Sequence, residues 1–187
     1  MDTLTIIIIA VVVIAVLVLL FWFIAIYNRF YSLKNAASAT LGQIKVAMKK
    51  RLDQIEQLLG AVQSYAKCEK ATLESVPQMR ASVMGAGTNE LRSIDAESRK
   101  LFGNILAVAE NYPDLKANRN VASLQEELTG TENKISFARQ FYNDSVMRYD
   151  IKRQTFPSNL VAGMFHFVDR EYFQTAEAEK AAPQVKF

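Results

Sequence analysis

The feature that most constrains the fold is an uncharged apolar run that begins at Leu4 and ends at Ile26. As a helix, these 23 residues would extend roughly 35 Å, whereas a bilayer's hydrocarbon core is about 30 Å thick. In lipid, every backbone N–H and C=O must bond within its own segment, so a single span is helical even when many of its residues are β-branched. The run therefore predicts a transmembrane helix.

This run differs from a cleaved secretory signal. A signal has a basic segment followed by an apolar stretch of about 7–15 residues, whereas Asp2 is the one charged side chain that precedes this run. The small residues Ala37-Ser38-Ala39 resemble a cleavage site, but they lie more than ten residues beyond Ile26. We therefore expect residues 1–28 to form an uncleaved anchor in the lipid bilayer.

The flanking charges predict the orientation of the anchor. Arg29 and Lys34 follow the span and Asp2 precedes it. Lys and Arg favour the cytoplasmic side, so we expect the N-terminus outside and the larger domain in the cytoplasm. Aromatic residues at the inner end would anchor the helix at headgroup level: Phe21, Trp22, Phe23, Tyr27, Phe30 and Tyr31. The interface anchors that we single out are Trp22, Tyr27, Arg29 and Tyr31.

The composition of the remaining chain excludes several kinds of site. Its 22 basic residues all follow residue 28, where 18 acidic residues accompany them, so this part carries a net charge of +4. The charges are mixed along the chain, which argues against a nucleic-acid partner. Cys68 and His166 are the only residues of their kinds, which excludes an internal disulfide and a multi-Cys or multi-His zinc site. We expect no cofactor and no metal.

Helical periodicity runs through the rest of the chain, and no segment has a convincing strand pattern. Apolar residues recur at intervals of three and four in three stretches, each interrupted by a polar residue: Arg51 in the first, Ser98 in the second, and Thr131 and Ser145 in the third. Such seams are buried only against other helices. The predicted fold is all-α: the transmembrane helix continues into an antiparallel bundle of three long helices, with a short helix near the C-terminus. The seams consist of Leu41, Ile44, Met48, Ile55, Leu58, Val62 and Tyr65; Leu91, Ile94, Leu101, Ile105 and Val108; and Val121, Leu124, Leu128, Ile135, Ala138, Tyr142 and Tyr149.

Local signals predict where these helices begin and end. Pro77 suits a helical first turn, and Gly85 and Gly87 delay the next helix until about Asn89. Pro113 forces extended geometry on Tyr112 and ends that helix near residue 110 or 111. Asn118 or Asn120 would cap the third helix, with Ser123 and Glu126 as a later capping box. Phe156-Pro157 would end it after about 36 residues.

We expect the bundle at residues 29–160 and a closing segment with a mobile tail at 161–187. No linker rich in Pro or Gly follows the span. The anchor should therefore enter the bundle as one rod, with a possible kink near Ser32 or Gly42.

An ordered series of residues along the chain carries a resemblance to a known family. The series runs through Ala109-Glu110-Asn111-Tyr112-Pro113-Asp114-Leu115-Lys116-Ala117-Asn118, Leu124-Gln125, Glu127-Leu128, Thr131-Glu132-Asn133, Ala138-Arg139, Tyr142-Asn143, Tyr149, Phe156-Pro157, Ala162, Phe167 and Tyr172-Phe173, and Tyr27-Asn28 and Arg51 fit as well. This series resembles the LemA family of bacterial membrane proteins. Lys134 departs from the more usual Arg, and Val121-Ala122 replaces a bulkier pair.

The resemblance implies a single-pass protein of the bacterial inner membrane with a helical cytoplasmic domain. It supplies no activity. Relatives are linked to membrane organisation, including that of magnetosome membranes, and to genes for a membrane metalloprotease. We take the following residues as structural or contact residues of the family motif: Glu110, Asn111, Tyr112, Pro113, Asp114, Leu115, Thr131, Glu132, Asn133, Arg139, Tyr142, Asn143, Phe156 and Pro157.

Two motifs have a structural interpretation that we favour over a functional one. The Glu110–Asn118 segment could be a contact surface, but a Tyr-Pro-Asp turn more often sets the angle of a hairpin. A carboxylate cluster could indicate a di-iron site, but the required Glu-x-x-His pairs are absent from the sequence. We expect Glu132 and Arg139 to form interhelical ion pairs that set register. Catalytic nucleophile and nucleotide motifs are also absent.

The sequence thus favours a non-enzymatic protein that self-assembles through its bundle and organises, scaffolds or shapes the inner membrane. The alternative is an adaptor or regulator of a neighbouring membrane protease or signalling protein. The first predicts a homo-oligomer, and the second predicts stable association with another membrane protein.

Overall fold

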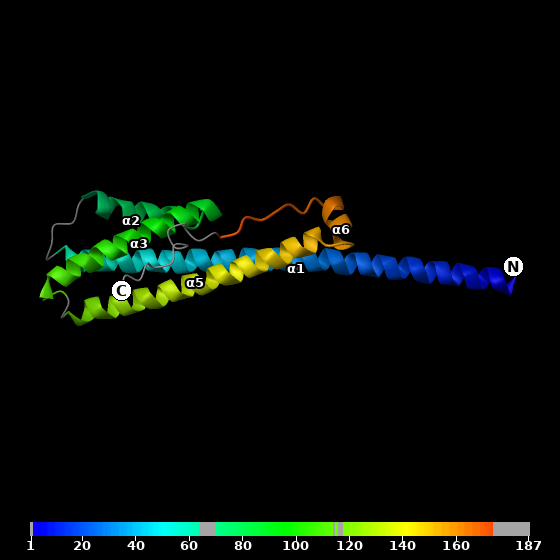
Figure 1. Ribbon diagram of the computed structural model, residues 1–187, viewed down its shortest axis with the longest axis horizontal. Coiled ribbons are helices and arrows are strands. Elements are labelled where there is room, and N and C mark those ends of the chain that lie inside the picture. Colours follow the sequence, from blue (N-terminus) through cyan, green and yellow to red (C-terminus); the bar gives the residue numbers. More distant parts are fainter. Residues whose placement is uncertain (1, 64–69, 114, 116–117, 174–187) are drawn as a thin grey trace, which may run out of the picture. The chain divides into compact units, whose positions relative to one another are not determined.

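The computed structural model describes residues 2–63, 70–113, 115 and 118–173. Within these residues the chain forms helices and no strands (Figure 1). The helices are α1 (Thr3–Val62), α2 (Lys70–Ser82), α3 (Thr88–Asn111), α5 (Arg119–Gln154) and α6 (Ser158–Met164). The predicted all-α class is confirmed for this part of the chain.

Helix α1 contains the apolar run and continues to Val62, through Ser32 and Gly42. It is long and apolar enough to cross a membrane, and its most apolar stretch is entirely unburied. A surface of Leu, Ile and Val that no other element covers is what lipid would contact in a span. The expected continuation of the anchor into the next helix is confirmed at the level of secondary structure.

The chain divides into two compact units that share α1 and α5. Unit 1 comprises Met1–Ser38 and Asp144–Arg170, and unit 2 comprises Ala39–Asn143 and Glu171–Phe187. Each unit is therefore assembled from segments far apart in the sequence. The domain boundaries expected after residues 28 and 160 stay a prediction.

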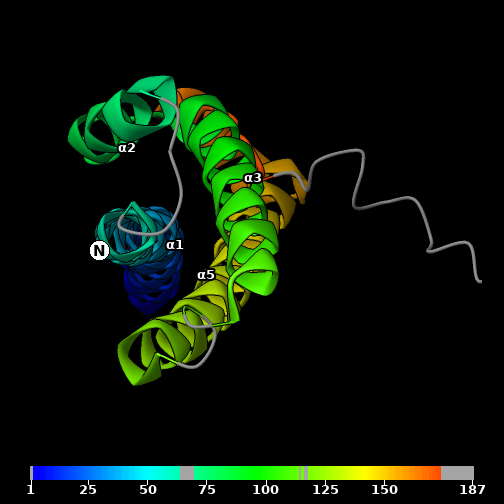
Figure 2. The same ribbon diagram turned by 90° about the vertical axis from the view of Figure 1, so that its left-hand side faces the viewer.

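In unit 2, α2 lies beside α1 (Figure 2), and polar contacts give its direction relative to α1. Arg80 of α2 pairs with Asp53, whereas Met84, just after α2, accepts a hydrogen bond from Lys45 at 3.1 Å. The later residue in one segment contacts the earlier residue in the other, so α2 returns antiparallel to α1.

Helix α5 is antiparallel to both α1 and α3 within unit 2. Gln54 and Arg51 of α1 contact Glu127 and Glu132 respectively. In α3, the earlier Asp95 pairs with Arg139 and the later Arg99 pairs with Glu132. It follows that α1 and α3 run parallel to each other. The expected antiparallel arrangement of three long helices is thus not confirmed, because α2 returns the chain between α1 and α3.

The prediction that Pro77 lies in the first turn of a helix is wrong. Helix α2 begins at Lys70, so Pro77 lies inside it. A proline there lacks the N–H for one helical hydrogen bond. Val76, Met79 and Val83 are nonetheless buried, and their spacing of three and four gives α2 an apolar face. Burial of this face stabilises a helix that local propensity disfavours.

The predicted ends of α3 and α5 agree with the structure. Tyr112, which follows α3, has extended geometry with φ −123° and ψ 97°. The Oδ1 atom of Asn118 accepts a hydrogen bond from the backbone N–H of Asn120 at 3.0 Å. Asn118 therefore caps α5, and the alternative capping box at Ser123 and Glu126 lies inside the helix. Tyr65, Cys68 and the predicted mobile tail lie outside the described residues.

In unit 1, α6 closes over α1 and α5. Ile26, Phe30 and Leu33 of α1 form one buried cluster with Tyr149 of α5 and with Val161 and Ala162 of α6. After α6, the backbone N–H groups of His166 and Phe167 donate to Gly163 and Ala162 at 3.3 and 3.0 Å. His166 adopts φ +52°, so this is a Schellman-type end with His at a position that Gly usually occupies. The turn places Phe167 on Phe30, with ring centroids 4.7 Å apart.

Candidate functional site

Unit 2 contains a cluster of charged side chains centred on Arg51, which is only 1% exposed. One guanidinium nitrogen, Nη2, lies 2.5 Å from Oδ1 of Asp95 and 2.6 Å from Oγ of Ser98. The other, Nη1, pairs with Glu132 on α5. Three helices therefore meet at a single arginine.

Two further arginines complete this ion-pair cluster. Arg99 lies 2.8 Å from the second oxygen of Glu132, and Arg139 pairs with Asp95. Arg139 also lies over the ring of Phe173, 4.7 Å from its centroid. Burial lowers the pKa of Arg139, and the charge of Asp95 opposes that effect. The cluster holds three positive and two negative groups.

The geometry of the cluster suits structural linkage. Guanidinium groups are planar donors that match carboxylates, so each pairing fixes one helix relative to another. The expected interhelical ion pairs of Glu132 and Arg139 are present. No three His, Cys, Asp or Glu side chains lie close enough to hold a metal ion within the described ranges.

A smaller polar contact lies beside the cluster. The Thr131 hydroxyl is 3.0 Å from Oε1 of Gln54 and 2.9 Å from the carbonyl oxygen of Glu127. The amide of Gln54 donates to the Glu127 carboxylate at 3.1 Å. Gln54 and Thr131 are both buried, so this contact satisfies two polar groups that would otherwise destabilise the core.

Two residues of the family motif, Tyr142 and Asn143, hold residues 171–173 in unit 2. The Tyr142 hydroxyl donates to the carbonyl of Glu171 at 2.9 Å. Asn143 donates to the carbonyl of Phe173 at 3.0 Å and accepts from its backbone N–H at 2.8 Å. This reciprocal pair places Phe173 where Arg139 covers it.

The other motif residues lie in turns or at the surface. Glu110, Asn111, Tyr112 and Pro113 are exposed at the end of α3, Leu115 is buried, and Asp114 lies outside the described residues. Asn133 is exposed on α5. Phe156 and Pro157 connect α5 with α6 through a cis peptide bond. The structure thus brings Thr131, Glu132, Arg139, Tyr142 and Asn143 to one region, whereas the turn residues are separate from it.

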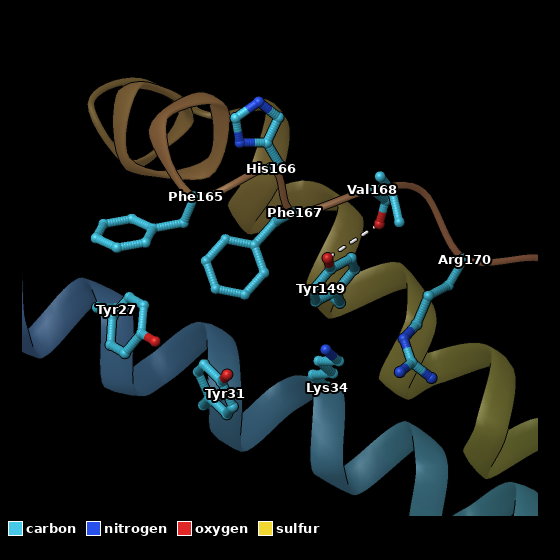
Figure 3. Close-up of a pocket in the computed structure, with 9 residues that line it drawn as sticks. All are labelled: Tyr27, Tyr31, Lys34, Tyr149, Phe165, His166, Phe167, Val168 and Arg170. Carbon is cyan, nitrogen blue, oxygen red and sulfur yellow. Dashed lines mark hydrogen bonds between the residues drawn. The ribbon is translucent and has the colours of Figure 1, made fainter.

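Unit 1 contains a pocket of about 350 Å³ (Figure 3). The Tyr149 hydroxyl donates to the carbonyl of Val168 at 3.0 Å across one side of it. Burial raises the pKa of Tyr149, while the charges of Arg170 and Arg153 oppose that effect. The residues lining this pocket are Tyr27, Tyr31, Lys34, Tyr149, Phe165, His166, Phe167, Val168 and Arg170.

The predicted interface anchors occupy different environments. Trp22, Arg29 and Tyr31 are exposed, whereas Tyr27 is half-buried beside Phe165, with ring centroids 4.7 Å apart. Phe30, grouped with these aromatics on sequence grounds, is fully buried in the core of unit 1. The turn after α6 covers its ring, so Phe30 does not face lipid, and the headgroup level of this group of aromatics stays a prediction.

Unit 2 also has an open apolar groove of about 640 Å³ between α1, α5 and Met84. Val46 and Met84 are 60% and 52% exposed. Phe137, near the α5 residues that line the groove, is 69% exposed. We call this surface the groove face. The groove is lined by Ala39, Gly42, Gln43, Val46, Ala47, Lys50, Met84, Lys134 and Ala138.

Comparison with known proteins decides the family. The sequence model of the LemA family matches residues 40–187, which include the ion-pair cluster and all the groove-lining residues except Ala39. The chain belongs to the LemA family.

Three relatives extend the comparison. The protein LemA of Metamycoplasma hominis is 25% identical over 150 residues, which cover 79% of this chain and 67% of the relative. Two magnetosome proteins of Paramagnetospirillum magneticum, MamQ 1 and MamQ 2, are each 28% identical over 92 residues. That match covers 49% of this LemA-family chain and 34% of each magnetosome protein. The similarity is therefore limited to part of each sequence.

Sequence reasoning missed two members of the ion-pair cluster in this LemA-family chain, Asp95 and Arg99. It also missed Gln54, which forms the polar contact beside the cluster. A signal was present, because Arg51, Ser98 and Thr131 are three of the four polar residues that interrupt the apolar seams. Arg51 and Ser98 contact each other, and Thr131 contacts Gln54, one turn from Arg51. Polar interruptions of separate seams are thus candidates for mutual contact.

Proposed function

We propose that this chain is a non-enzymatic membrane protein that self-associates through the groove face of unit 2 and so organises the bacterial inner membrane. The main observation in support is an apolar groove of about 640 Å³ on unit 2. Helix α1, which contributes to this unit, also contains the candidate membrane span. Exposed apolar surface of this kind marks an interaction site when it is contiguous. The names of the two magnetosome relatives support a role at bacterial membranes.

A second copy of the chain fits this groove. Copies inserted into one membrane share an orientation, so a two-fold contact between them has its axis along the membrane normal. In such a contact the same patch faces itself. The exposed Phe137 of each copy is then a candidate to fill the groove of the other, since a volume of 640 Å³ is within the range of about 300–1,000 Å³ for ligand pockets.

The orientation with the larger domain in the cytoplasm belongs to the same proposal. The parts of unit 1 at residues 29–38 and 144–170 contain six basic residues and three acidic ones. This excess of positive charge near the end of the span supports a cytoplasmic location.

The lysines that line the groove give a discriminating test. Lys50 and Lys134 can lay their alkyl stems along its apolar walls while their ammonium groups stay in water. In a symmetric contact these like charges repel each other, and salt screens them with a Debye length of about 8 Å at physiological ionic strength. Self-association should therefore strengthen as salt rises, whereas binding of an acidic partner would weaken.

The experiment is energy transfer between donor- and acceptor-labelled copies of the full chain in liposomes, over a range of protein-to-lipid ratios. Val46→Glu should weaken association roughly ten- to hundredfold, because it removes about 1.5–3 kcal/mol of apolar burial. The matched control is Leu106→Glu, which changes an exposed apolar residue of α3 in the same unit and should leave association unchanged.

Two results would overturn the proposal. One is energy transfer no higher than random proximity gives at every density. The other is a monomeric chain that co-purifies with a different membrane protein and loses that protein on Val46→Glu, which would support the adaptor hypothesis.

A further inference from the structure

Helix α6 of unit 1 is apolar on two opposite sides. Val161 and Ala162 are buried against α1 and α5, whereas Leu160 and Met164 are 63% and 65% exposed. No charged residue occurs from Ser158 to Met164. The apolar stripe of a helix is normally buried, yet Leu160 and Met164 have no cover in the described structure.

The exposed side of α6 continues into its neighbours. Phe156, two residues before α6, is 74% exposed, and Phe165, directly after α6, is 43% exposed. Leu160 and Met164 are four residues apart and so share one face of the helix. Together, Phe156, Leu160, Met164 and Phe165 form what we call the α6 apolar face.

The contacts of the following segment fix the position of this face along α1. Phe165 lies against Phe23 and Tyr27, with ring centroids 5.8 and 4.7 Å apart. Farther along, Arg170 donates to Ser38 at 3.2 Å. The segment thus runs beside α1 away from the span, and its start lies about 20 Å closer to the span than its end, at about 1.5 Å per residue of α1.

Figure 1 shows α6 beside the part of α1 where the apolar run ends. Ile26, the last residue of that run, belongs to the same buried cluster as Val161 and Ala162. The α6 apolar face therefore lies beside the end of the apolar run, at the level where a bilayer's hydrocarbon core gives way to headgroups.

We propose that the α6 apolar face inserts into the membrane interface next to the span, so that lipid acyl chains and glycerol groups cover it. The chain then has two membrane contacts, one that crosses the bilayer and one that lies in a single leaflet. Interfacial elements of this kind bury apolar side chains about 5–10 Å deep. A second contact would restrict the tilt and rotation of α1 about its own axis.

The charges around the α6 apolar face favour lipid over a protein partner. Arg29 and Lys34 follow the span, and Lys152, Arg153 and Arg170 flank α6 in sequence. Asp150 and Asp169, the nearest acidic residues on either side of α6 in sequence, both pair with Arg153, so the basic residues remain in excess. Basic residues beside an apolar interfacial surface attract anionic headgroups. The apolar centre and basic edge of this surface thus match the two layers of a leaflet.

The single Trp of the chain, Trp22, makes a direct test possible. The unmodified full chain is placed in liposomes of phosphatidylcholine and phosphatidylglycerol, with or without phosphatidylcholine brominated near the headgroup end of the acyl chain. Quenching of Trp22 reports whether the span is inserted. In a Trp22→Phe background, Leu160→Trp and Met164→Trp then report on the α6 apolar face.

The matched control is Val168→Trp in the same background. Val168 is 72% exposed and apolar, but it lies near the level of Lys34 and away from Tyr27 (Figure 3). Lys34 is about 10 Å farther along α1 than Tyr27. We expect blue-shifted emission and at least twofold stronger quenching by brominated lipid at positions 160 and 164 than at 168. Raising the phosphatidylglycerol fraction should increase this difference.

Two outcomes would overturn the inference while Trp22 is quenched. In the first, Trp at positions 160 and 164 emits at the same long wavelength as Trp at 168 and is no more quenched by brominated lipid, which would show that the face remains in water. Blue-shifted emission that brominated lipid does not quench would show that protein covers it. Because the inference needs only an inserted span, it is distinguishable from self-association through the groove face: Val46→Glu should leave all of these signals unchanged.

Discussion

Asp95 is the residue whose removal should destabilise unit 2 most clearly. Its carboxylate is the partner of Arg51, which is 1% exposed, and of Arg139, and it lies 3.5 Å from Arg99. In Asp95→Ala, Glu132 is the one acidic group left in the ion-pair cluster, facing three arginines. A buried charge that loses its partner destabilises a protein by about 3–5 kcal/mol. Arg99 is about one-third exposed, so solvent reduces its share of this effect.

Asp53→Ala is the matched control. Asp53 also pairs with an arginine from another helix, Arg80, but the two side chains are 34% and 44% exposed. A surface ion pair of this kind contributes about 0–1 kcal/mol. The same chemical change should therefore have a much smaller effect at position 53 than at position 95.

Hydrogen exchange followed by mass spectrometry on the full chain in nanodiscs measures the difference. Since about 1.4 kcal/mol corresponds to a factor of ten, Asp95→Ala should speed exchange of the protected amides of α3 and α5 in unit 2 by roughly 10²- to 10⁴-fold. The double variant Arg51→Met with Asp95→Ala should lose less stability than the sum of the single variants, because neither partner then remains buried alone. Equal effects of Asp95→Ala and Asp53→Ala would refute the reasoning.

Two further changes test the contacts around this core. Tyr149→Phe removes the hydrogen bond to Val168 and should cost about 0.5–1.5 kcal/mol. Because burial raises the folded-state pKa of Tyr149, this contribution should be complete below pH ~10 and decline as pH rises through the folded-state value, which denaturant titrations at several pH values would detect; a difference that grows with alkaline pH contradicts it. Asn143→Ala removes both hydrogen bonds to Phe173 and should cost about 1–3 kcal/mol, seen as faster exchange of the Phe173 amide, whereas Asn133→Ala at an exposed site should leave that amide unchanged.

The helical elements were largely predictable because their causes are local. Apolar residues at intervals of three and four identify α3, α5 and the part of α1 beyond the span, Asn118 supplies the cap of α5, and Pro113 extends Tyr112 at the end of α3. The wrong prediction that Pro77 lies in the first turn of a helix is equally informative. Local propensity argues against a proline inside a helix, but α2 forms because tertiary contacts bury Val76, Met79 and Val83.

The ion-pair cluster shows the limit of sequence reasoning at the candidate site. The spacing of Glu132 and Arg139 indicated interhelical ion pairs, but not their partners. Asp95 and Arg51 lie on α3 and α1, which were expected to be antiparallel and are parallel. The direction of α3 relative to α1 depends on whether the chain turns back between them. Helix α2 turns it back, so α1 and α3 run parallel.

The sequence alone therefore determined the apolar span, the all-α class and most helix ends, since each follows from periodicity, capping or a proline within a few residues. The tertiary structure decided which residues meet. Burial of Arg51 requires carboxylates from two other helices, and burial of Phe30 requires the turn after α6 to bring Phe167 onto it. Such contacts join segments from about 40 to more than 130 residues apart, and pairing over that distance depends on the fold as a whole.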